Sequence, residues 1–342
     1  MSPTTLVKQD AIPFLEFPSP NRNDKTCKQC LVFFITGNPG LAAYYTPFLT
    51  TLRHLLNERE SAPSSSQAYH IYCRNLLGFS DLDHQPPFGT ASSNFSQTTT
   101  LPFTLEDQIQ SVASTLHTLH ALNTSTPFHQ IILIGHSVGA YIATEIFHRN
   151  HHLSPSSSLP LASGILLFPT LTHIALSPSG QKLNLIRNQP LLNTWTHVVA
   201  KSIINLLPTF LLSSILSKLM HFPRHAAAAT LEFLQSRDGI WQAIHMGKDE
   251  MATITEEKWS LELWQLSHDT EAKGEKFYFY FAQKDHWVAD EVRDAFIEKR
   301  QGDKNGRTRA VICEEGIPHA FCIHHSETVA EKVRVWIEEI TG

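Results

Sequence analysis

Short, strongly apolar runs recur along the chain and alternate with segments that have the spacing of amphipathic helices. Each run is long enough for a buried strand, and the runs lie at 31–36, 69–73, 131–134, 164–168, 277–282 and 309–313. Between the second and third runs, apolar residues keep helical spacing from Ile109 to Leu119, behind Thr104, which we expect to cap the helix together with Asp107. Strands that alternate with helices predict an α/β fold with a mainly parallel, doubly wound sheet.

The alternation of strands and helices stops between Pro169 and about Lys273 and resumes with the run at 277–282. The missing strand signals predict a helical insertion that caps the sheet or lies on a membrane. We therefore divide the chain as follows: 1–30 lead-in, 31–168 first part of the core, 169–273 helical insertion, 274–342 second part of the core.

One stretch of this insertion is unusually apolar, because no charged side chain occurs from Ser202 to Ser217. Polar residues recur in it at every fourth position, which predicts one polar face and a wide apolar face: Asn205, Thr209, Ser213, Ser217. The uncharged run is shorter than the roughly 20 residues that span a bilayer, and Pro208 interrupts it. A spanning helix is therefore disfavoured.

Two interpretations of the apolar stretch stay open. The stretch could lie in the plane of a lipid surface, with Trp195, Lys201, Lys218 and Arg224 near the headgroups. It could instead form a cap helix over an apolar pocket. Both interpretations predict an apolar substrate.

Ser137 directly follows the third apolar run, inside Gly135-His136-Ser137-Val138-Gly139. A G-x-S-x-G motif between a strand and a helix is typical of the nucleophile elbow of α/β-hydrolases, where small residues permit a sharp turn. The turn lifts the serine hydroxyl above the sheet, and the helix N-terminus favours negative charge at the attacked atom. We predict that Ser137 is a nucleophile; the alternative is a glycine-flanked turn with a surface serine.

A serine nucleophile requires a base and an acid that orients the base, and α/β-hydrolases supply them in the order Ser, Asp or Glu, His. Asp285 stands just past the fifth apolar run and is the predicted acid, with Asp290 as the nearest alternative. His319 stands in the loop after the last run and is the predicted base. Because the chain has 20 histidines, His324 and His325 are kept as alternatives.

An acyl-transfer enzyme also needs two backbone N–H groups aimed at the developing oxyanion. One is expected from Val138, the residue after the nucleophile, and the other from the loop after the first apolar run. That loop reads Gly37-Asn38-Pro39-Gly40, and because proline has no N–H, we predict Asn38 as the second donor. The same residues also occur in plain turns.

Composition narrows the class of protein. With 342 residues, 42% hydrophobic and 17% charged, the chain can bury a full core and still present an apolar surface. A net charge of −5 gives no reason to expect a nucleic-acid partner. Five scattered cysteines predict no disulfide framework, and the lone C-x-x-C of Cys27 and Cys30 does not indicate zinc, so we expect no cofactor and no metal. Segment 1–20 lacks a signal-peptide core, which predicts the cytosolic side.

Further motifs accompany the candidate site. They are Tyr44-Tyr45 and Phe48 behind the Gly37-Asn38-Pro39-Gly40 loop, Ala140-Tyr141 behind the elbow, Leu167-Phe168-Pro169-Thr170, Ser177-Pro178-Ser179-Gly180, Asp285-His286-Trp287-Val288 and His319-Ala320-Phe321. Together these segments resemble the lipid droplet-associated hydrolase family of serine α/β-hydrolases over nearly the whole chain from about residue 30. The resemblance implies the α/β-hydrolase fold, with Ser137 as nucleophile, Asp285 as acid and His319 as base of a catalytic triad. It also implies residence on lipid droplets and the endoplasmic reticulum, a role in lipid storage, and sterol esters or other neutral lipids as substrates.

Two functions are therefore considered. The first is hydrolysis of carboxylic esters of apolar lipids through an acyl-enzyme. The second is a protein that binds or organises lipid at the droplet surface, with weak or vestigial esterase activity. Dehalogenase chemistry is disfavoured because it would require an aspartate in place of Ser137. Acyl transfer to an alcohol instead of water uses the same triad and is a further alternative.

Overall fold

The computed structural model describes residues 12–62, 66–84, 87–89, 100–123, 127–259, 263–264, 275–300 and 307–342. The start of the predicted lead-in and the predicted boundary at 273–274 lie outside the described residues.

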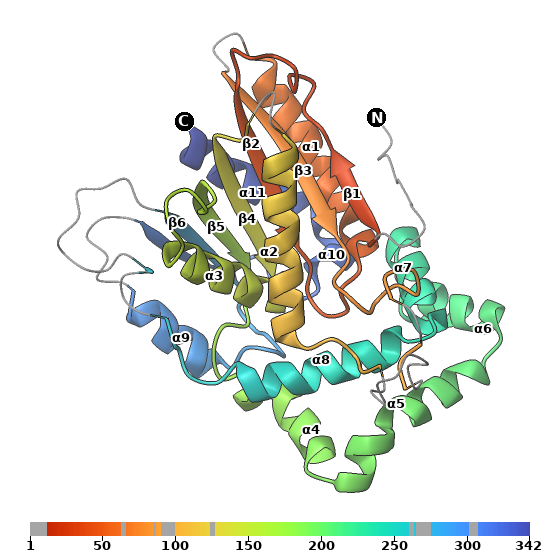
Figure 1. The fold of residues 1–342 in the computed structure, drawn as a ribbon. Coiled ribbons are helices and arrows are strands. Elements are labelled where there is room, and N and C mark those ends of the chain that lie inside the picture. The colour runs from red at the N-terminus through yellow and green to blue at the C-terminus, as the bar shows by residue number, and fades with distance from the viewer. Residues whose placement is uncertain are drawn as a thin grey trace, which may run out of the picture.

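The described residues form one seven-stranded sheet at the centre of the molecule (Figure 1). Its strands in spatial order are β1 (Phe14–Phe17), β3 (Gln67–Arg74), β2 (Lys28–Ile35), β4 (Gln130–His136), β5 (Leu161–Leu167), β6 (Lys276–Phe281) and β7 (Thr308–Ile312). Strand β1 is antiparallel to β3, and every other neighbouring pair is parallel. The predicted mainly parallel, doubly wound sheet is confirmed.

Helices cover both faces of the sheet, which explains why its central strands are continuous apolar runs rather than alternating ones. Helices α1 (Thr46–Glu60) and α11 (Ser326–Thr341) lie on one face, and α2 (Leu105–Leu122) and α3 (Val138–His151) lie on the other (Figure 1). The predicted cap of α2 is confirmed: the Asp107 N–H donates to Thr104 Oγ1 at 3.2 Å, and the Thr104 N–H donates to the Asp107 carboxylate at 2.8 Å. Shorter elements complete the core: η1 (Ala42–Tyr45), α9 (Asp290–Glu298) and α10 (Phe321–His324).

The strand order reverses at β2, and this reversal determines where a ligand can bind. From β2 the chain runs through α1 to β3 on one side, whereas β4 pairs with the other side of β2. At such a switch point the loops after neighbouring strands diverge and leave a crevice at the carboxyl edge of the sheet. The Gly37–Gly40 loop and Ser137 follow the two strands that flank this point.

Between β5 and β6, the described residues form helices and loops. The helices are η2 (Ile174–Leu176), α4 (Pro178–Arg187), α5 (Pro190–Asn205), α6 (Thr209–Ser214), the π-helix η3 (Ile215–Leu219), α7 (Arg224–Gln235) and α8 (Gly239–Thr253). Helix α8 contacts the loop after β2, and α4 and α5 lie on its side away from the sheet (Figure 1).

The apolar stretch at 202–217 is not one helix. Helix α5 ends at Asn205, Pro208 precedes α6, and the two helical segments meet at 95°. The predicted polar face shared by Asn205 and Thr209 is therefore wrong, because the proline ring and its missing N–H break the helix between them. Among the described residues no single helix is long and apolar enough to cross a membrane. The bent pair 194–205 and 209–219, taken together, has the length and the apolar composition of a membrane span.

Helix α5 presents several large apolar residues outward, whereas His197 and Lys201 face the neighbouring helices. His197 stacks on Trp241 of α8 with ring centroids 4.3 Å apart, and Lys201 Nζ donates to the carbonyl oxygens of Leu234 and Ser236 at 3.1 and 2.7 Å. The expectation that Lys201 lies among headgroups is therefore wrong, because its ammonium group binds the carboxyl end of α7.

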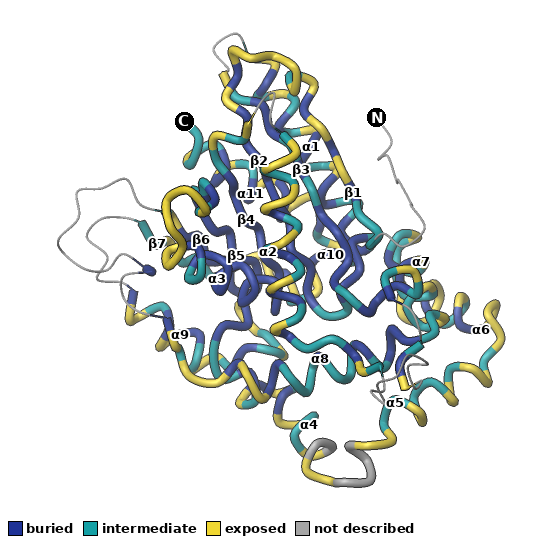
Figure 2. The backbone as a smooth tube through the Cα atoms, viewed as in Figure 1, coloured by how far each residue is buried: buried dark blue, intermediate teal, exposed yellow. Residues whose placement is uncertain are grey.

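The outward side chains form a surface that we call the apolar arm. It consists of the exposed residues Trp195 (56%), Val199 (54%), Ile203 (57%), Leu206 (82%), Phe210 (73%) and Leu219 (74%). Helices α5 and α6, which carry most of it, project from the body of the molecule and are largely exposed along their outer sides (Figure 2). Lys218 and Arg224 are exposed near its end, and their expected place near headgroups stays a prediction.

Candidate active site

One residue, Ser137, separates β4 from α3, and its backbone is strained. Its φ of 56° and ψ of −123° lie in a region that residues other than glycine rarely occupy. A Cβ atom at Gly139 would collide with the carbonyl oxygen of Ile35, and one at Gly135 would collide with the backbone of Gly139. The motif therefore needs both glycines, and the structure has the geometry of a nucleophile elbow.

The structure brings the three predicted side chains together. His319 Nε2 lies 2.9 Å from Ser137 Oγ, and His319 Nδ1 lies 2.8 Å from Asp285 Oδ2. The histidine side chain is 13% exposed and the aspartate 4%, so the acid is buried while the base is reachable from solvent. This geometry lets the imidazole take the serine proton while the carboxylate holds the opposite ring nitrogen. The catalytic roles themselves stay predictions.

Asp285 is held in its ionised form. Burial alone would raise its pKa, but the hydrogen bond from His319, the charge of that histidine and the Trp287 N–H together lower the pKa below its ordinary value. The Trp287 N–H donates to the second carboxylate oxygen at 2.7 Å. An ionised, fixed carboxylate can stabilise the imidazolium that forms during catalysis.

The alternative residues do not occupy these positions. His324 is exposed on α10, and His325 follows the end of that helix. Asp290 accepts a hydrogen bond from Arg293 at 3.0 Å. Among the described residues, none of these three is hydrogen-bonded to Ser137.

The two predicted oxyanion donors border the nucleophile. Val138 is the first residue of α3, and Asn38 follows β2 on the neighbouring loop. A Cβ atom built at Gly37 would lie 3.1 Å from Ser137 Cβ, so this loop approaches the nucleophile closely. Within the described part of the chain, neither the Val138 N–H nor the Asn38 N–H donates a hydrogen bond, which leaves both available for an oxyanion. Their role stays a prediction.

Sequence reasoning missed a chain of hydrogen bonds that joins this loop to the base. His136 Nε2 donates to the His319 carbonyl oxygen at 2.9 Å, because a carbonyl can only accept. Burial, together with the neighbouring His319, lowers the pKa of His136 to about 3, so the ring is neutral and its Nδ1 accepts from Tyr45 Oη at 2.7 Å. Tyr45 Oη accepts from the Gly37 N–H at 3.1 Å. The signal that could have revealed this chain is a histidine at the end of a strand that is polar otherwise only at Gln130, its first residue.

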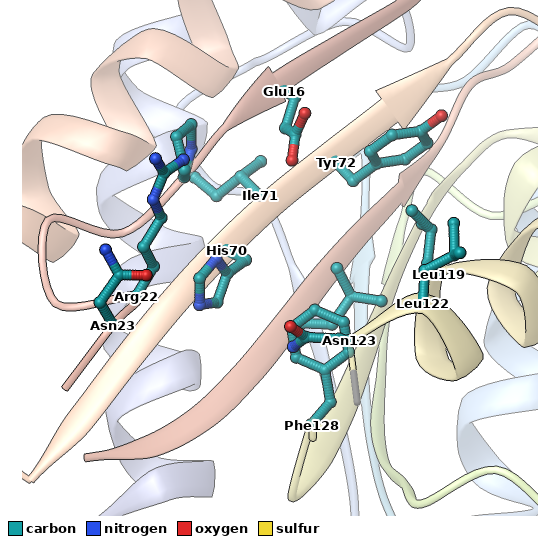
Figure 3. Close-up of a pocket in the computed structure, with 12 residues that line it drawn as sticks. Glu16, Arg22, Asn23, His70, Ile71, Tyr72, Leu119, Leu122, Asn123 and Phe128 are labelled. Atoms are coloured by element: carbon teal, nitrogen blue, oxygen red, sulfur yellow. The ribbon is translucent and has the colours of Figure 1, made fainter. Parts of the chain in front are cut away.

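Two other features of the described residues were compared with the site. The described residues contain no group of three or more His, Cys, Asp or Glu placed to hold a metal ion, and all five cysteines are free and buried. A pocket of about 290 Å³ lies across β1, β3 and the end of α2, where Glu16, His70, Tyr72 and Leu122 line it (Figure 3). No member of the predicted triad lines this pocket.

Comparison with known proteins gives matches over most of the chain. The family described as "Lipid-droplet associated hydrolase" matches residues 28–322. Proteins named lipid droplet-associated hydrolase are similar to it: the Mus musculus protein is 26% identical over 92% of this chain and 87% of its own length. The Gallus gallus protein is 27% identical over 92% and 86%, and the Drosophila melanogaster protein 24% over 90% and 89%.

Solved structures share the fold. A peroxisomal α/β-hydrolase from Saccharomyces cerevisiae has a TM-score of 0.59 at 13% identity, covering 99% of this chain and 85% of that chain. A soluble variant of monoglyceride lipase from the same yeast has a TM-score of 0.57 at 13% identity, covering 100% and 97%. A thermophilic esterase from Thermogutta terrifontis has a TM-score of 0.54 at 14% identity, covering 100% of both chains. These matches confirm the predicted α/β-hydrolase fold.

Proposed function

Because the chain belongs to the lipid droplet-associated hydrolase family, we propose that it cleaves carboxylic esters of apolar lipids through an acyl-enzyme on Ser137. The observation that carries the proposal is the pair of hydrogen bonds made by His319, 2.9 Å to Ser137 Oγ and 2.8 Å to Asp285 Oδ2. Each of the three side chains comes from a loop after a different strand, yet they form one hydrogen-bonded row. No structural role requires this arrangement at a strained, partly exposed serine.

The reaction has two halves that use the same groups. His319 Nε2 takes the Ser137 proton as Oγ bonds to the ester carbon, and the backbone N–H groups of Asn38 and Val138 stabilise the oxyanion. The C–O bond to the alcohol then breaks, and the imidazolium returns its proton to the leaving alkoxide. In the second half, His319 takes a proton from water, the hydroxide attacks the acyl carbon, and Ser137 leaves with the proton as the fatty acid is released.

An apolar ester is the proposed substrate class, with sterol esters and other neutral lipids as its candidates. The apolar arm supports this choice, because large exposed apolar surfaces mark contact with lipid or with another protein. The family name supports residence on lipid droplets. We further propose the cytosolic face of the endoplasmic reticulum as a second site of residence, and a role in lipid storage.

The direct test is covalent labelling by a fluorophosphonate probe, which reacts with activated serines. Wild type should be labelled at Ser137, and Ser137→Ala should lose the label while it keeps its fold by circular dichroism. The pair is then compared on a panel of sterol esters, glycerides and short-chain esters to define the substrate. A folded wild-type protein that takes up no probe would refute the proposal.

A second candidate function is attachment to the droplet surface, and the orientation of α5 supports it. A soluble cap helix would place Lys201 outward and Ile203 inward, whereas this helix has the reverse arrangement. The lipid layer is the proposed occupant of the apolar arm, which belongs to the insertion predicted at 169–273.

Flotation with triolein droplets coated with a phosphatidylcholine monolayer tests this attachment. The double variant Leu206→Ser and Phe210→Ser should lower the bound fraction about tenfold or more, since each buried apolar side chain contributes about 1.5–3 kcal/mol. Leu122→Ser is the matched control, because Leu122 is 75% exposed on α2 outside the arm. Equal binding of all three proteins contradicts the proposal. If Ser137→Ala keeps the full effect on droplet size in cells while the arm variant loses it, binding outweighs catalysis.

A further inference from the structure

The side chain of Asn38 is bound by the helical insertion, not by its own loop. Its Nδ2 donates one proton to the Ala243 carbonyl oxygen at 3.1 Å and the other to Glu250 Oε1 at 3.0 Å. Both acceptors lie on α8, about two turns apart along the same face. Gly247 lies between them, and a Cβ atom built at this glycine would be 3.7 Å from the amide nitrogen. The residue whose backbone N–H is the proposed oxyanion donor is therefore attached to α8 through its side chain.

Glu250 is an unusual acceptor for the Asn38 amide, because its carboxyl group is buried. It is 5% exposed, and among the described residues Asn38 is its hydrogen-bonding side-chain partner, with no cation beside it. Burial, and to a lesser degree the charge of Asp249, raises the pKa of Glu250 to about 8. At neutral pH the carboxyl group is thus mainly protonated, and its carbonyl oxygen still accepts from the amide. A buried carboxyl group without an ion pair costs stability, so its place against Asn38 calls for an explanation.

We propose that Glu250 is a positioning residue that ties helix α8 to the oxyanion loop and thereby fixes the direction of the Asn38 N–H. This inference rests on the proposed ester hydrolysis. The Tyr45 hydroxyl holds the neighbouring Gly37 N–H from the side of the core, and Glu250 holds Asn38 from the side of the insertion. With both residues fixed, the free N–H of Asn38 has one orientation, which is the condition for stabilising charge that develops only in the transition state.

The test measures p-nitrophenyl butyrate hydrolysis and the rate constant of fluorophosphonate labelling for a set of variants. Glu250→Ala should lower kcat and the labelling rate about 10- to 100-fold, because a misplaced donor loses much of its effect, while KM changes less than threefold. Glu250→Gln keeps the acceptor oxygen and should stay within about threefold of wild type. Glu256→Ala, which removes an exposed carboxylate just past the end of α8, is the matched control with unchanged rates.

A second variant covers the case in which Glu250→Ala does not fold. Asn38→Ala removes the same two hydrogen bonds from the other end and keeps the backbone N–H, so it should reproduce the loss in kcat. If both single variants fold, the double variant should be no slower than the slower single one, because both changes break one link.

The outcomes separate this inference from the proposed function. If wild type is labelled but Glu250→Ala stays within twofold of it, or Glu250→Gln is as slow as Glu250→Ala, the positioning role is wrong and the hydrolase proposal stands. Additive losses in the double variant also overturn it. If wild type itself is not labelled, the hydrolase proposal fails, and this inference falls with it.

Discussion

Removing the hydroxyl group of Tyr45 should lower both the free energy of unfolding and the reactivity of the candidate site. The hydroxyl accepts from the Gly37 N–H at 3.1 Å and donates to His136 Nδ1 at 2.7 Å, and Tyr45 is 3% exposed. Tyr45→Phe leaves two buried polar groups without partners, at about 1–3 kcal/mol each, so the free energy of unfolding should fall by about 2–6 kcal/mol.

The neighbouring residue supplies a matched control. Tyr44 Oη bonds Thr230 Oγ1 at 2.9 Å, and Thr230 itself donates to the Ala226 carbonyl oxygen. Tyr44→Phe therefore removes the same atom but leaves no donor unpaired, and we expect a loss of about 0.5–1.5 kcal/mol.

Urea unfolding followed by tryptophan fluorescence measures both variants. The reaction rate should also differ, because without the Tyr45 proton the His136 ring can change tautomer and release the His319 carbonyl oxygen. We expect fluorophosphonate labelling of Tyr45→Phe to slow about tenfold, and that of Tyr44→Phe to stay near wild type. If the two variants lose the same unfolding free energy, within about 0.5 kcal/mol, the hydrogen bonds from Gly37 through Tyr45 and His136 to His319 do not contribute the expected stability.

Three further predictions concern other parts of the site. Asp285→Asn should slow labelling about 10³- to 10⁴-fold with the fold intact by circular dichroism, because the amide no longer fixes the working tautomer of His319; a loss below tenfold would contradict the triad. Burial raises the pKa of Glu250 from 4.5 to about 8, so the folded state retains a proton that the unfolded state releases, and stability falls as pH rises through that window. In urea titrations, the free energy of unfolding of Glu250→Gln relative to wild type should therefore rise by a few kcal/mol between pH 5 and pH 8, at about 1.4 kcal/mol per unit of pKa. A difference between the two proteins that does not change with pH would refute the raised pKa. Gly139→Ala should lose about 2 kcal/mol or more through collision with the neighbouring loop, whereas Gly247→Ala, whose Cβ has only an ordinary contact at 3.7 Å, should be neutral or slightly stabilising; equal melting temperatures would contradict this.

The sequence was informative where local pattern and topology determine position. The apolar runs predict every strand of the sheet except β1. Because parallel strands end at one edge of the sheet, topology alone predicts that Ser137, Asp285 and His319 lie at that edge. Spacing alone could not show their hydrogen bonds, which depend on loop conformations such as the positive φ of Gly316 before the base.

What the sequence did not reveal depends on contacts between distant segments. The period of α5 predicts two faces, but which face meets α7 and α8 is decided by packing, and Lys201 was consequently placed on the wrong side. The partner of Asn38 is separated from it by more than half of the chain, and no local pattern connects residue 38 to Glu250. The proton positions on His136 follow only from the carbonyl group that it faces.

The two protons of the Asn38 amide also limit how this architecture can be rearranged in evolution or by engineering. Because both are used by one face of α8, a chimera that receives a foreign insertion between β5 and β6 loses the support of its oxyanion loop even though every triad residue is retained. Exchange of this segment between homologues should therefore succeed only when positions 38 and 250 are inherited from the same parent, because position 243 contributes a backbone carbonyl oxygen that any residue supplies.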